Sequence, residues 1–282
     1  MQPTLCRVVS GLSCALLLLA APAGTAAESA GKKPDGPAAV KLMPLTPKLD
    51  FGPKPLQGSL EHSETLPAVK KQFKIGTTLD ANVLPKQPVA EGWYWIPDWR
   101  AGTWQSRQTT VTFYQNFKTG EKRSGRFASP FTSVVYKGFQ KDKDGHIWDY
   151  MAAPYSQVVD AGSFREVQLI SQNRPVYVSS QRIVMYLRGT TMRVNSQSKK
   201  IMANEQWESL QTFTPAGPDR ISCAGSTKFF DAHGKPQYIQ RNTALFFRTA
   251  AFKPINQMKG KDMRGHFRTY LASHGLKQLV PK

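Results

Sequence analysis

The residue types that carry most enzyme chemistry are present in this sequence, but few of them have a spacing that supports catalysis or metal binding. The chain contains no Gly-x-Ser-x-Gly, His-Glu-x-x-His or Cys-x-x-Cys motif and no glycine-rich phosphate loop. His266 and His274 are eight residues apart and could share one helix face, yet no histidine or carboxylate at i+4 joins them as a metal ligand. The sequence therefore predicts no catalytic residue, no metal site and no bound cofactor.

Three further arrangements are explained better by structure than by chemistry. Glu205 and Glu208 have an odd separation in a strand-like segment, so their side chains point to opposite faces and cannot form an acid/base pair locally. KDKDGHIWD resembles the start of a calcium loop, but His146 stands where a third oxygen ligand is needed, which favours a hairpin turn. We expect His233, in the turn segment DAHG, to be solvated, and Cys223 to be a buried strand residue rather than a reactive thiol.

Residues 1–27 have the composition of a secretory signal peptide. Arg7 precedes a short apolar run and an Ala-rich stretch, and this run is shorter than the roughly 20 residues that span a bilayer, which disfavours a permanent anchor. Two of the three cysteines fall inside this segment, so Cys223 alone remains and no intramolecular disulfide is expected. We therefore expect an exported protein, periplasmic or secreted, that is held together by its own core.

The chain is strongly basic, with 38 Lys and Arg residues against 19 Asp and Glu residues and a formal net charge of +19. Short groups such as VKKQFK, GEKRSGR and QSKK carry this charge, and no run of five or more basic residues occurs. Such a protein attracts anionic envelope polymers and anionic membrane surfaces, and it has no specific nucleic-acid motif. A soluble basic surface explains the same charge without a dedicated polyanion site.

Residues 28–90 differ in composition from the rest of the chain. Proline recurs every few positions, lysine is frequent, and Phe51 and Phe73 are the only aromatic residues. Such a segment buries too little apolar area to offset the entropy of ordering it, so we expect a disordered leader. The stretch SETLPAVKKQFKIG could form a helical turn or two within it.

Residues 91–252 are expected to form one antiparallel β domain, because short segments rich in Val, Thr and aromatic residues alternate with Gly, Asp and Asn turns from Thr103 onward. In YIQRNTALFFRTAAF, QRIVMYLRG and NEQWESLQTF, both parity classes mix apolar and polar residues. A barrel with a partly polar interior tolerates this mixture, and strands that are only half covered would explain it equally. The aromatic candidates for ligand contact are Trp99, Tyr186, Trp207 and Phe246.

The segment AGTWQSR resembles the Gly-x-Trp opening of the calycin superfamily, the lipocalin-like barrels. Gly102 and Trp104 match the motif, and the resemblance implies that an arginine of the last strand stacks on the tryptophan and closes one end of the barrel. Arg248 is the first candidate for this arginine and Arg241 the second. The resemblance also implies an up-and-down β-barrel that holds a small molecule. The chain departs from the family by its leader, by its basicity and by the missing disulfide.

The stretch EGWYWIPDWRAGTW contains four tryptophans, of which Trp93, Trp95 and Trp99 precede the first expected strand and Trp104 lies at its start. A lipocalin-like chain crosses the closed end of its barrel there, and large aromatic rings would plug that end. Pro97 breaks any helix, so we expect a turn that directs Trp99 and Trp104 toward the barrel base. The alternative is an exposed aromatic platform for glycan or lipid contact.

Residues 253–282 contain one amphipathic pattern, in which apolar positions recur at helical spacing. The stripe consists of Met263, Phe267, Tyr270, Leu271 and His274. We expect a C-terminal helix on the outside of the barrel. A basic helix that rests on an anionic membrane is the alternative.

Three functions remain open from the sequence. The first is an exported, non-enzymatic binding protein that holds a small apolar or amphipathic molecule in a β-barrel. The second is a basic, envelope-associated interaction protein that binds anionic polymers or a membrane surface. The third is an enzyme built on a lipocalin-like barrel, for which the sequence gives no positive sign.

Overall fold

A computed structural model describes residues 61–85 and 90–281, and the predictions for residues 1–60 lie outside this range. The main element is an antiparallel sheet of eight strands in the order β3-β2-β11-β10-β9-β8-β7-β6. Its strands are β2 (Gly102–Asn116), β3 (Lys122–Lys137), β6 (Tyr155–Asp160), β7 (Phe164–Val178), β8 (Ile183–Asn195), β9 (Ile201–Pro215), β10 (Arg220–Phe230) and β11 (Pro236–Ala250). The expectation of an antiparallel, mostly β protein is confirmed.

Short polar turns make the long hairpins of this sheet. The Asn116 side chain accepts hydrogen bonds from the backbone of Lys118 and Thr119 between β2 and β3, and Asn195 caps the turn between β8 and β9 in the same way. Asp231 accepts from the backbone of His233 and Lys235 between β10 and β11. Asn and Asp favour such turns because their side chains bond the backbone two residues ahead.

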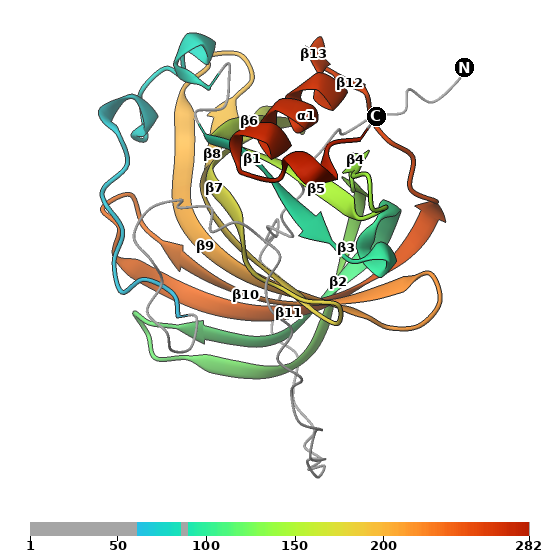
Figure 1. Cartoon of the computed structure of the whole chain (residues 1–282). Helices are drawn as coiled ribbons and strands as arrows, with labels where there is room; N and C mark the ends of the chain where they lie inside the picture. The colour runs from blue at the N-terminus through green and yellow to red at the C-terminus, as the bar shows by residue number, and fades with distance from the viewer. Residues whose placement is uncertain (1–60, 86–89, 282) are drawn as a thin grey trace, which may run out of the picture.

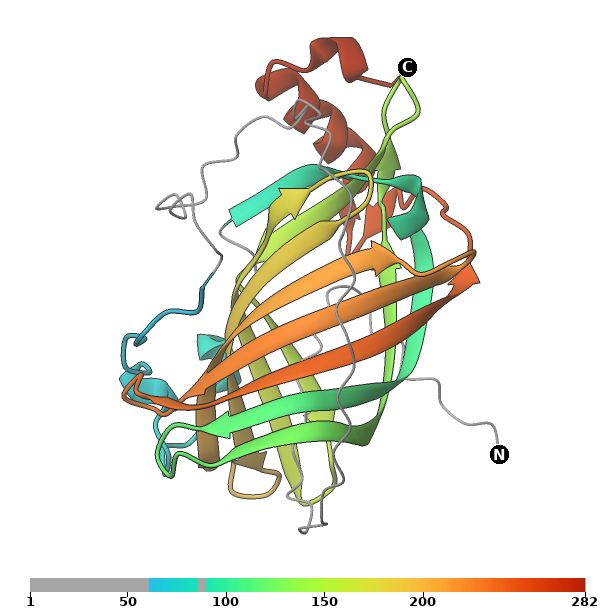
Figure 2. The ribbon, with the colours of Figure 1, turned by 90° about the horizontal axis from the view of Figure 1, so that it is seen from below.

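The sheet is strongly curved, so one of its faces is concave and the other convex (Figure 1 and Figure 2). Among the described residues, the hydrogen-bonded order ends on β3 and β6, which are not neighbours in it. A closed barrel is therefore not shown by the strand pairing. The concave face nevertheless holds the largest apolar core of the protein, with Trp104, Ile183, Phe213, Ile221 and Phe246 among its buried members.

A smaller antiparallel sheet lies beside the main one, in the order β1-β5-β4. Its strands are β1 (Ala90–Ile96), β4 (Gln140–Lys141) and β5 (Ile147–Ala153). The segment around Trp93 is thus a strand itself and does not merely precede the first one, which corrects the sequence-based expectation. Trp93 contributes to the apolar cluster beneath the C-terminal helix, whereas Tyr94 and Ile96 contribute to the main core. After Pro97 the chain makes the expected turn, the short helix η3 (Asp98–Arg100).

The C-terminal helix α1 (Met263–Ser273) packs on the smaller sheet (Figure 1). Asp262 caps its N-terminus by accepting a hydrogen bond from the Gly265 amide, and two short strands, β12 (Gln257–Met258) and β13 (Lys261–Asp262), precede it. The predicted stripe is buried at Met263, Phe267, Tyr270 and Leu271, against aromatic rings that include Trp93, Phe139 and Trp148. The apolar face of α1 is therefore covered by the protein's own sheet. In the described range no helix combines the length and apolar character that crossing a membrane requires.

Residues 61–85 do not behave as the leader prediction requires, because they lie along the convex face of the main sheet. Leu66 and Val69 are buried, and their amides donate to the carbonyls of Gly234 and Ala232, each over 2.9 Å. The segment contains two helical turns, η1 (Lys71–Phe73) and η2 (Ala81–Val83), and Phe73 is buried against apolar side chains of β7, β8 and β9. The burial of Leu66, Val69 and Phe73, together with these backbone hydrogen bonds, offsets the entropy lost on ordering the segment. The composition alone had suggested that this entropy would keep the segment disordered.

Candidate ligand site on the concave face

Strand register determines which side chains share the concave face. Residues directly opposite each other on paired strands point to the same side, and the side changes with each residue along a strand. One row runs through Phe246, Ile221 and, one strand further, Pro215, and the next rows pair Ala244 with Cys223 and Asn242 with Gly225. Along the strands, the concave face carries three successive zones. We call them the Trp104 end (Trp104 and Arg248), the polar belt (Thr109, Gln211, Gln240 and Asn242) and the Glu205 end (Glu205, Glu166, Tyr114 and Tyr238).

The Trp104 end contains the stacking contact that the calycin resemblance implied. The Arg248 guanidinium lies over the Trp104 indole, 4.6 Å from the ring centroid, and the two residues face each other on β11 and β2. Arg248 also donates to the carbonyls of Ala101 (2.8 Å) and Trp99 (3.4 Å). Arg241, the second candidate, instead stacks on Phe113 and is exposed.

Gly102 is required by this geometry. Its φ is +123°, and a Cβ there would lie 2.6 Å from the Ala250 carbonyl and 3.5 Å from the Arg248 guanidinium. Any larger residue would push β11 away from the start of β2. The Gly-x-Trp pattern thus has a local physical cause in this fold.

The four predicted ligand-contact residues do not form one group. Trp207 and Phe246 are buried on the concave face, and Trp99 packs against the same core while its Nε1 donates to the Ser180 carbonyl. Tyr186 lies on the convex face, which contradicts its selection as a ligand contact. Tyr186 is opposite Leu210 and Trp207 is opposite Gly189, so the two aromatic residues have opposite parity and cannot line one surface.

Tyr186 belongs instead to a polar contact between the convex face and residues 61–85. Its hydroxyl donates to the Glu208 carboxylate (2.7 Å), which also accepts from the Ser63 amide and hydroxyl (both 2.8 Å). Lys228 donates to the Ser63 carbonyl, and His62 lies 3.0 Å from the Ser226 hydroxyl. Burial and the adjacent Glu208 carboxylate raise the pKa of Tyr186.

The polar belt consists of amide and hydroxyl side chains in the middle of the concave face: Thr109, Gln211, Gln240 and Asn242. Each is at most 4% exposed. Thr109 Oγ1, Gln211 Nε2 and both polar atoms of Gln240 are buried without a hydrogen-bond partner among the described residues. A buried polar group without a partner destabilises a fold by about 1 to 3 kcal/mol. Native structures therefore contain few such groups, and each one calls for an explanation such as a functional role.

Gly225 gives the belt its shape. A Cβ at this position would lie 2.4 Å from the Asn242 Oδ1, so only glycine leaves room for the Asn242 side chain to extend over β10. Gln211 is the residue opposite Gly225 on the following strand. The missing side chain thus leaves the space over β10 to the Asn242 amide.

The Glu205 end lies beyond the belt and combines carboxylates with tyrosines. The Tyr238 ring stacks on Phe229, with centroids 4.3 Å apart and planes at 16°, and lies 5.5 Å from the Tyr114 ring. The Tyr238 hydroxyl is hydrogen-bonded to the Glu205 carboxyl group. Trp207 is held nearby, since its Nε1 donates to the Thr191 hydroxyl over 3.1 Å.

Burial changes the protonation chemistry of this end. Removal from water raises the pKa of Glu205 from its ordinary 4.5 to about 7, the Tyr238 hydrogen bond partly offsets this shift, and the Glu166 carboxylate adds to it. Burial, and then the proximity of Glu205, also raises the pKa of Tyr238. Glu205 therefore changes charge near neutral pH, unlike an ordinary surface glutamate.

Glu166 is the second carboxylate of the Glu205 end and is 6% exposed. Gln168 donates to it over 2.9 Å. Across the described residues, no lysine or arginine forms an ion pair with either Glu166 or Glu205. Arg193 stands opposite Glu166 in the register of β7 and β8, but its guanidinium stacks on the Phe164 ring at 4.6 Å.

The other chemically interesting residues have structural positions. Cys223 is buried within the core, His233 is exposed in a turn, and Asp142 organises the KDKDGH turn by accepting from the amides of Asp144 and His146. These three expectations are confirmed. In residues 61–85 and 90–281, no group of three or more His, Cys, Asp or Glu side chains could hold a metal ion.

The two histidines of α1 do not converge. His266 Nδ1 accepts a hydrogen bond from Trp93 Nε1 over 3.0 Å, and His266 Nε2 lies 3.1 Å from the Glu91 carboxylate. Burial and the neighbouring Lys261 lower the pKa of His266. His274, at the end of the helix, stacks instead on the Tyr270 ring.

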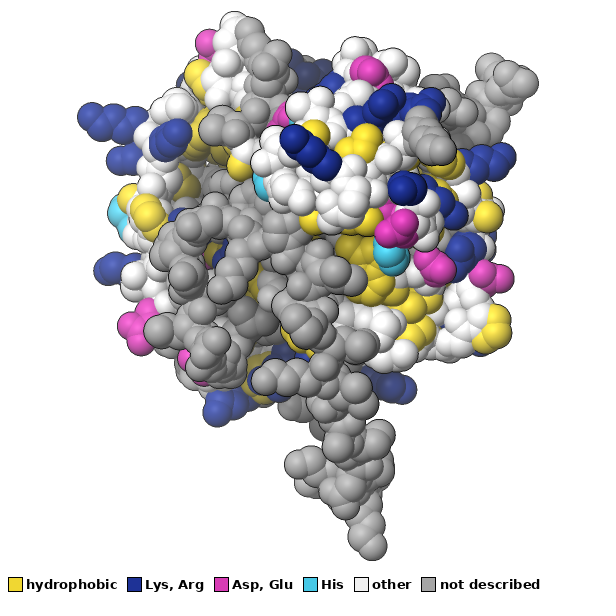
Figure 3. All heavy atoms as spheres, viewed as in Figure 1, with side chains coloured by type: hydrophobic (Ala, Val, Ile, Leu, Met, Phe, Trp, Pro, Cys, Tyr) yellow, Lys and Arg dark blue, Asp and Glu magenta, His cyan; other side chains and the backbone are white. Residues whose placement is uncertain are grey.

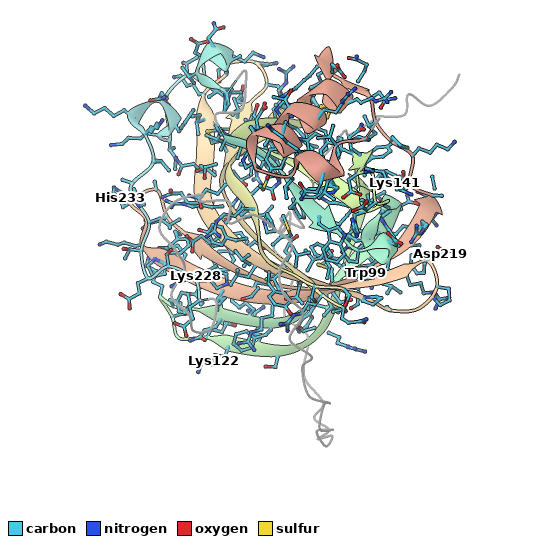
Figure 4. All side chains as sticks on the ribbon, viewed as in Figure 1. Trp99, Lys122, Lys141, Asp219, Lys228 and His233 are labelled. Atoms are coloured by element: carbon cyan, nitrogen blue, oxygen red, sulfur yellow. The ribbon has the colours of Figure 1, made fainter. Side chains whose placement is uncertain are left out.

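The strand ends can be followed through the labelled side chains of Figure 4. Trp99 and Asp219 mark the side of the Trp104 end, whereas Lys122, Lys228 and His233 mark the opposite side. On the face shown in Figure 3, Lys and Arg side chains are spread around the outline and do not gather into one patch. Positive charge is thus dispersed over this face.

Sequence reasoning missed the polar belt and the Glu205 end. The usable signal was the alternation in β9 and β11, where Gln211, Gln240 and Asn242 share the parity class of Phe213 and Phe246.

Comparison of the chain with protein-family models, characterised proteins and solved structures finds no match.

Proposed function

We propose that this protein is an exported, non-enzymatic binding protein that holds a small amphipathic molecule against the concave face. The observation that carries the proposal is the set of buried, unpartnered polar atoms of Thr109, Gln211 and Gln240. Their desolvation is unfavourable in the absence of a partner, and a ligand with matching donors and acceptors would offset it. Apolar groups border the belt on both sides, which suits a molecule with apolar and polar parts.

We further propose that the curved sheet is a calycin-like barrel. β3 leads directly into β4 and β5 leads directly into β6, and β4 pairs with β5 at Gln140–Trp148 and Lys141–Ile147. This pairing would join the two ends of the sheet order at one level. The contact among Gly102, Trp104 and Arg248 supports the same resemblance.

The direct test is native mass spectrometry of the mature protein purified from its own host, with organic extraction in parallel. We expect a stoichiometric small molecule that is released by extraction. Protein that carries no such molecule, and that sediments with envelope fragments at low salt and detaches at high salt, would favour the alternative of a basic, envelope-associated protein.

A matched pair of variants links the bound molecule to the belt. Gln240→Leu removes the unpartnered amide from the concave face, and Gln115→Leu removes the same group from the convex face of β2. We expect Gln240→Leu to lower the amount of copurifying molecule at least severalfold and Gln115→Leu to leave it unchanged. Equal occupancy in both variants would exclude the belt as the polar contact.

A further inference from the structure

We infer that the bound molecule carries a protonated amine, and that the Glu205 end binds this group between Glu205, Glu166 and the tyrosine rings. The inference rests on the proposed function and adds the chemical class of the ligand. It places the ammonium group at the Glu205 end and the remainder of the molecule along the polar belt.

The charge distribution supports a cation at this position. Glu166 is buried and Glu205 is half-buried, the two carboxylates lie close enough to interact electrostatically, and within the described part of the chain neither is paired with a lysine or arginine. The chain as a whole has 38 basic residues, so cationic side chains are abundant. Buried carboxylates are normally paired, and an ammonium ligand would supply the missing positive charge.

The ring positions support an organic cation in particular. Tyr114 and Tyr238 lie on adjacent strands with their centroids 5.5 Å apart, and Tyr238 is bonded to Glu205. Tyrosine faces attract ammonium groups within about 6 Å of the ring centroid, and aromatic rings combined with a carboxylate form a recurrent amine site. A metal ion would instead require several converging oxygen or nitrogen ligands.

Gln240 gives an independent indication of a ligand beside the tyrosines. It stands opposite Tyr114 in the β11–β2 register and two residues from Tyr238, so all three share the concave face. Gln240 is 1% exposed, and neither of its polar atoms has a partner among the described residues. Its carbonyl oxygen can accept from an ammonium group, and its amide can donate to a polar atom further along the ligand.

The charged groups around Glu205 determine how binding responds to pH. Glu166 on β7, Tyr238 on β11 and Tyr114 on β2 provide no positive charge, and the one arginine in register, Arg193 on β8, stacks on a phenylalanine ring. An ammonium ligand prefers ionised Glu205, whereas a neutral ligand has no such preference. Amine affinity should therefore rise as the pH increases through about 7, where Glu205 loses its proton.

The test compares three eight-carbon probes that differ only at one end: octylamine, octan-1-ol and octanoate. Binding to the mature protein, after removal of any copurifying molecule, is measured by calorimetry or by displacement of a fluorescent apolar dye. Octylamine stays protonated throughout pH 5.5 to 8, because alkylammonium groups titrate near 10, like lysine. We expect octylamine to bind most tightly, with an affinity that rises roughly tenfold or more between pH 5.5 and 8.

Glu205→Gln and Glu64→Gln form the matched pair for this measurement, since Glu64 is exposed and its substitution removes the same charge. We expect Glu205→Gln to abolish the preference for octylamine and its pH dependence, while octan-1-ol still binds. Glu64→Gln should behave as the parent. Circular dichroism checks that each variant is folded, and the comparison of the three probes on the parent protein tests the inference without any substitution.

The outcomes separate the inference from the proposed function. If octan-1-ol binds and octylamine shows no preference, or if octanoate binds best, the amine inference is wrong and the binding function stands. If the pH dependence persists in folded Glu205→Gln, the site is assigned to the wrong carboxylate and the inference fails. If none of the three probes binds, both the inference and the proposed function are overturned.

Discussion

The Trp104 end and the Glu205 end lie on the same face of the main sheet, yet their polar groups differ in how they are paired. They are separated by ten residues along β11, from Tyr238 to Arg248, or about 33 Å of extended strand. At the Trp104 end, Trp104 donates to the Arg100 carbonyl over 2.9 Å and Arg248 donates to two backbone carbonyls. At the Glu205 end, the buried Glu166 and the half-buried Glu205 each have a hydrogen-bond partner, Gln168 and Tyr238, but no basic partner among the described residues.

This difference distinguishes a part of the molecule that stabilises the fold from a part that we propose binds another molecule. A satisfied, close-packed end gains stability from each contact. Buried groups without partners reduce stability, and natural folds retain them mainly at functional sites. Substitutions at the two ends should therefore change stability in opposite directions.

The largest expected effect is at the Trp104 end. Trp104 is 1% exposed, so Trp104→Ala should lower the free energy of unfolding by about 3 to 5 kcal/mol through the cavity it leaves. Urea denaturation at pH 7 measures this change. Phe247→Ala is the control, because Phe247 lies on the convex face of β11 and is 45% exposed; it should lose far less. Similar losses in both variants would remove Trp104 as the core of this end.

The next effect is the pH dependence of stability that Glu205 contributes. Its folded pKa, about 7, is above its ordinary 4.5, so the folded state favours the protonated form. The contribution of Glu205 to stability is therefore fully present below pH 4.5 and is lost as the pH rises through 7, by about 3 kcal/mol at most. Glu205→Gln removes this contribution, so the variant should gain stability relative to the parent between pH 5 and pH 8.

Urea unfolding of the ligand-free protein at both pH values measures the Glu205 contribution, with Glu64→Gln as the control for loss of a carboxylate. The difference between the parent and Glu64→Gln should change little with pH. A stability difference between the parent and Glu205→Gln that is the same at pH 5 and pH 8 would show that Glu205 titrates normally, and the contrast between the two ends would then lose its electrostatic part.

A smaller effect is expected in the polar belt between the two ends. Gln240→Leu replaces an amide that has no partner among the described residues by an apolar group of similar size. The ligand-free protein should gain about 1 to 2 kcal/mol, because the desolvated amide is removed. Gln115→Leu on the convex face should change stability by less than about 0.5 kcal/mol. A destabilised Gln240→Leu variant would mean that this amide is satisfied in solution.

The sequence predicted the fold class better than the site because strand propensity and turn residues are local properties. The pattern of Val, Thr and aromatic residues, the turns at KDKDGH and DAHG, and the stripe of α1 each depend on neighbouring residues alone. The contact between Trp104 and Arg248 was anticipated through the family resemblance, since the Gly-x-Trp motif identified Trp104 and Arg248 was the first of two candidate partners. In contrast, the packing of residues 61–85 depends on apolar anchors that a proline-rich composition conceals.

The Glu205 end could not be predicted because it depends on the register of several strands. Glu205, Glu166 and Tyr238 lie on β9, β7 and β11, and no spacing in the sequence shows that their side chains meet. Tyr186 illustrates the same limit, since a parity error of one residue places an aromatic ring on the wrong face. Long-range pairing, rather than local propensity, assembles this site.

The last predicted effect, similar in size to that of Gln240→Leu, is that of Arg248→Lys, which tests whether the Trp104 end depends on planar stacking or on charge alone. Lysine keeps the positive charge and loses both the flat guanidinium 4.6 Å from the Trp104 centroid and its two backbone hydrogen bonds, so we expect a loss of about 1 to 2 kcal/mol. Arg220→Lys is the matched control, because Arg220 lies 5.8 Å from the exposed Phe247 ring and its replacement should change stability by a few tenths of a kcal/mol.

Urea unfolding at low and high salt distinguishes the explanations, since stacking and hydrogen bonds at a partly buried site are screened less than an exposed ion pair. Equal losses in the two variants, or a loss in Arg248→Lys that vanishes at high salt, would assign the Arg248 contribution to its ion pair with the exposed Asp219 rather than to Trp104.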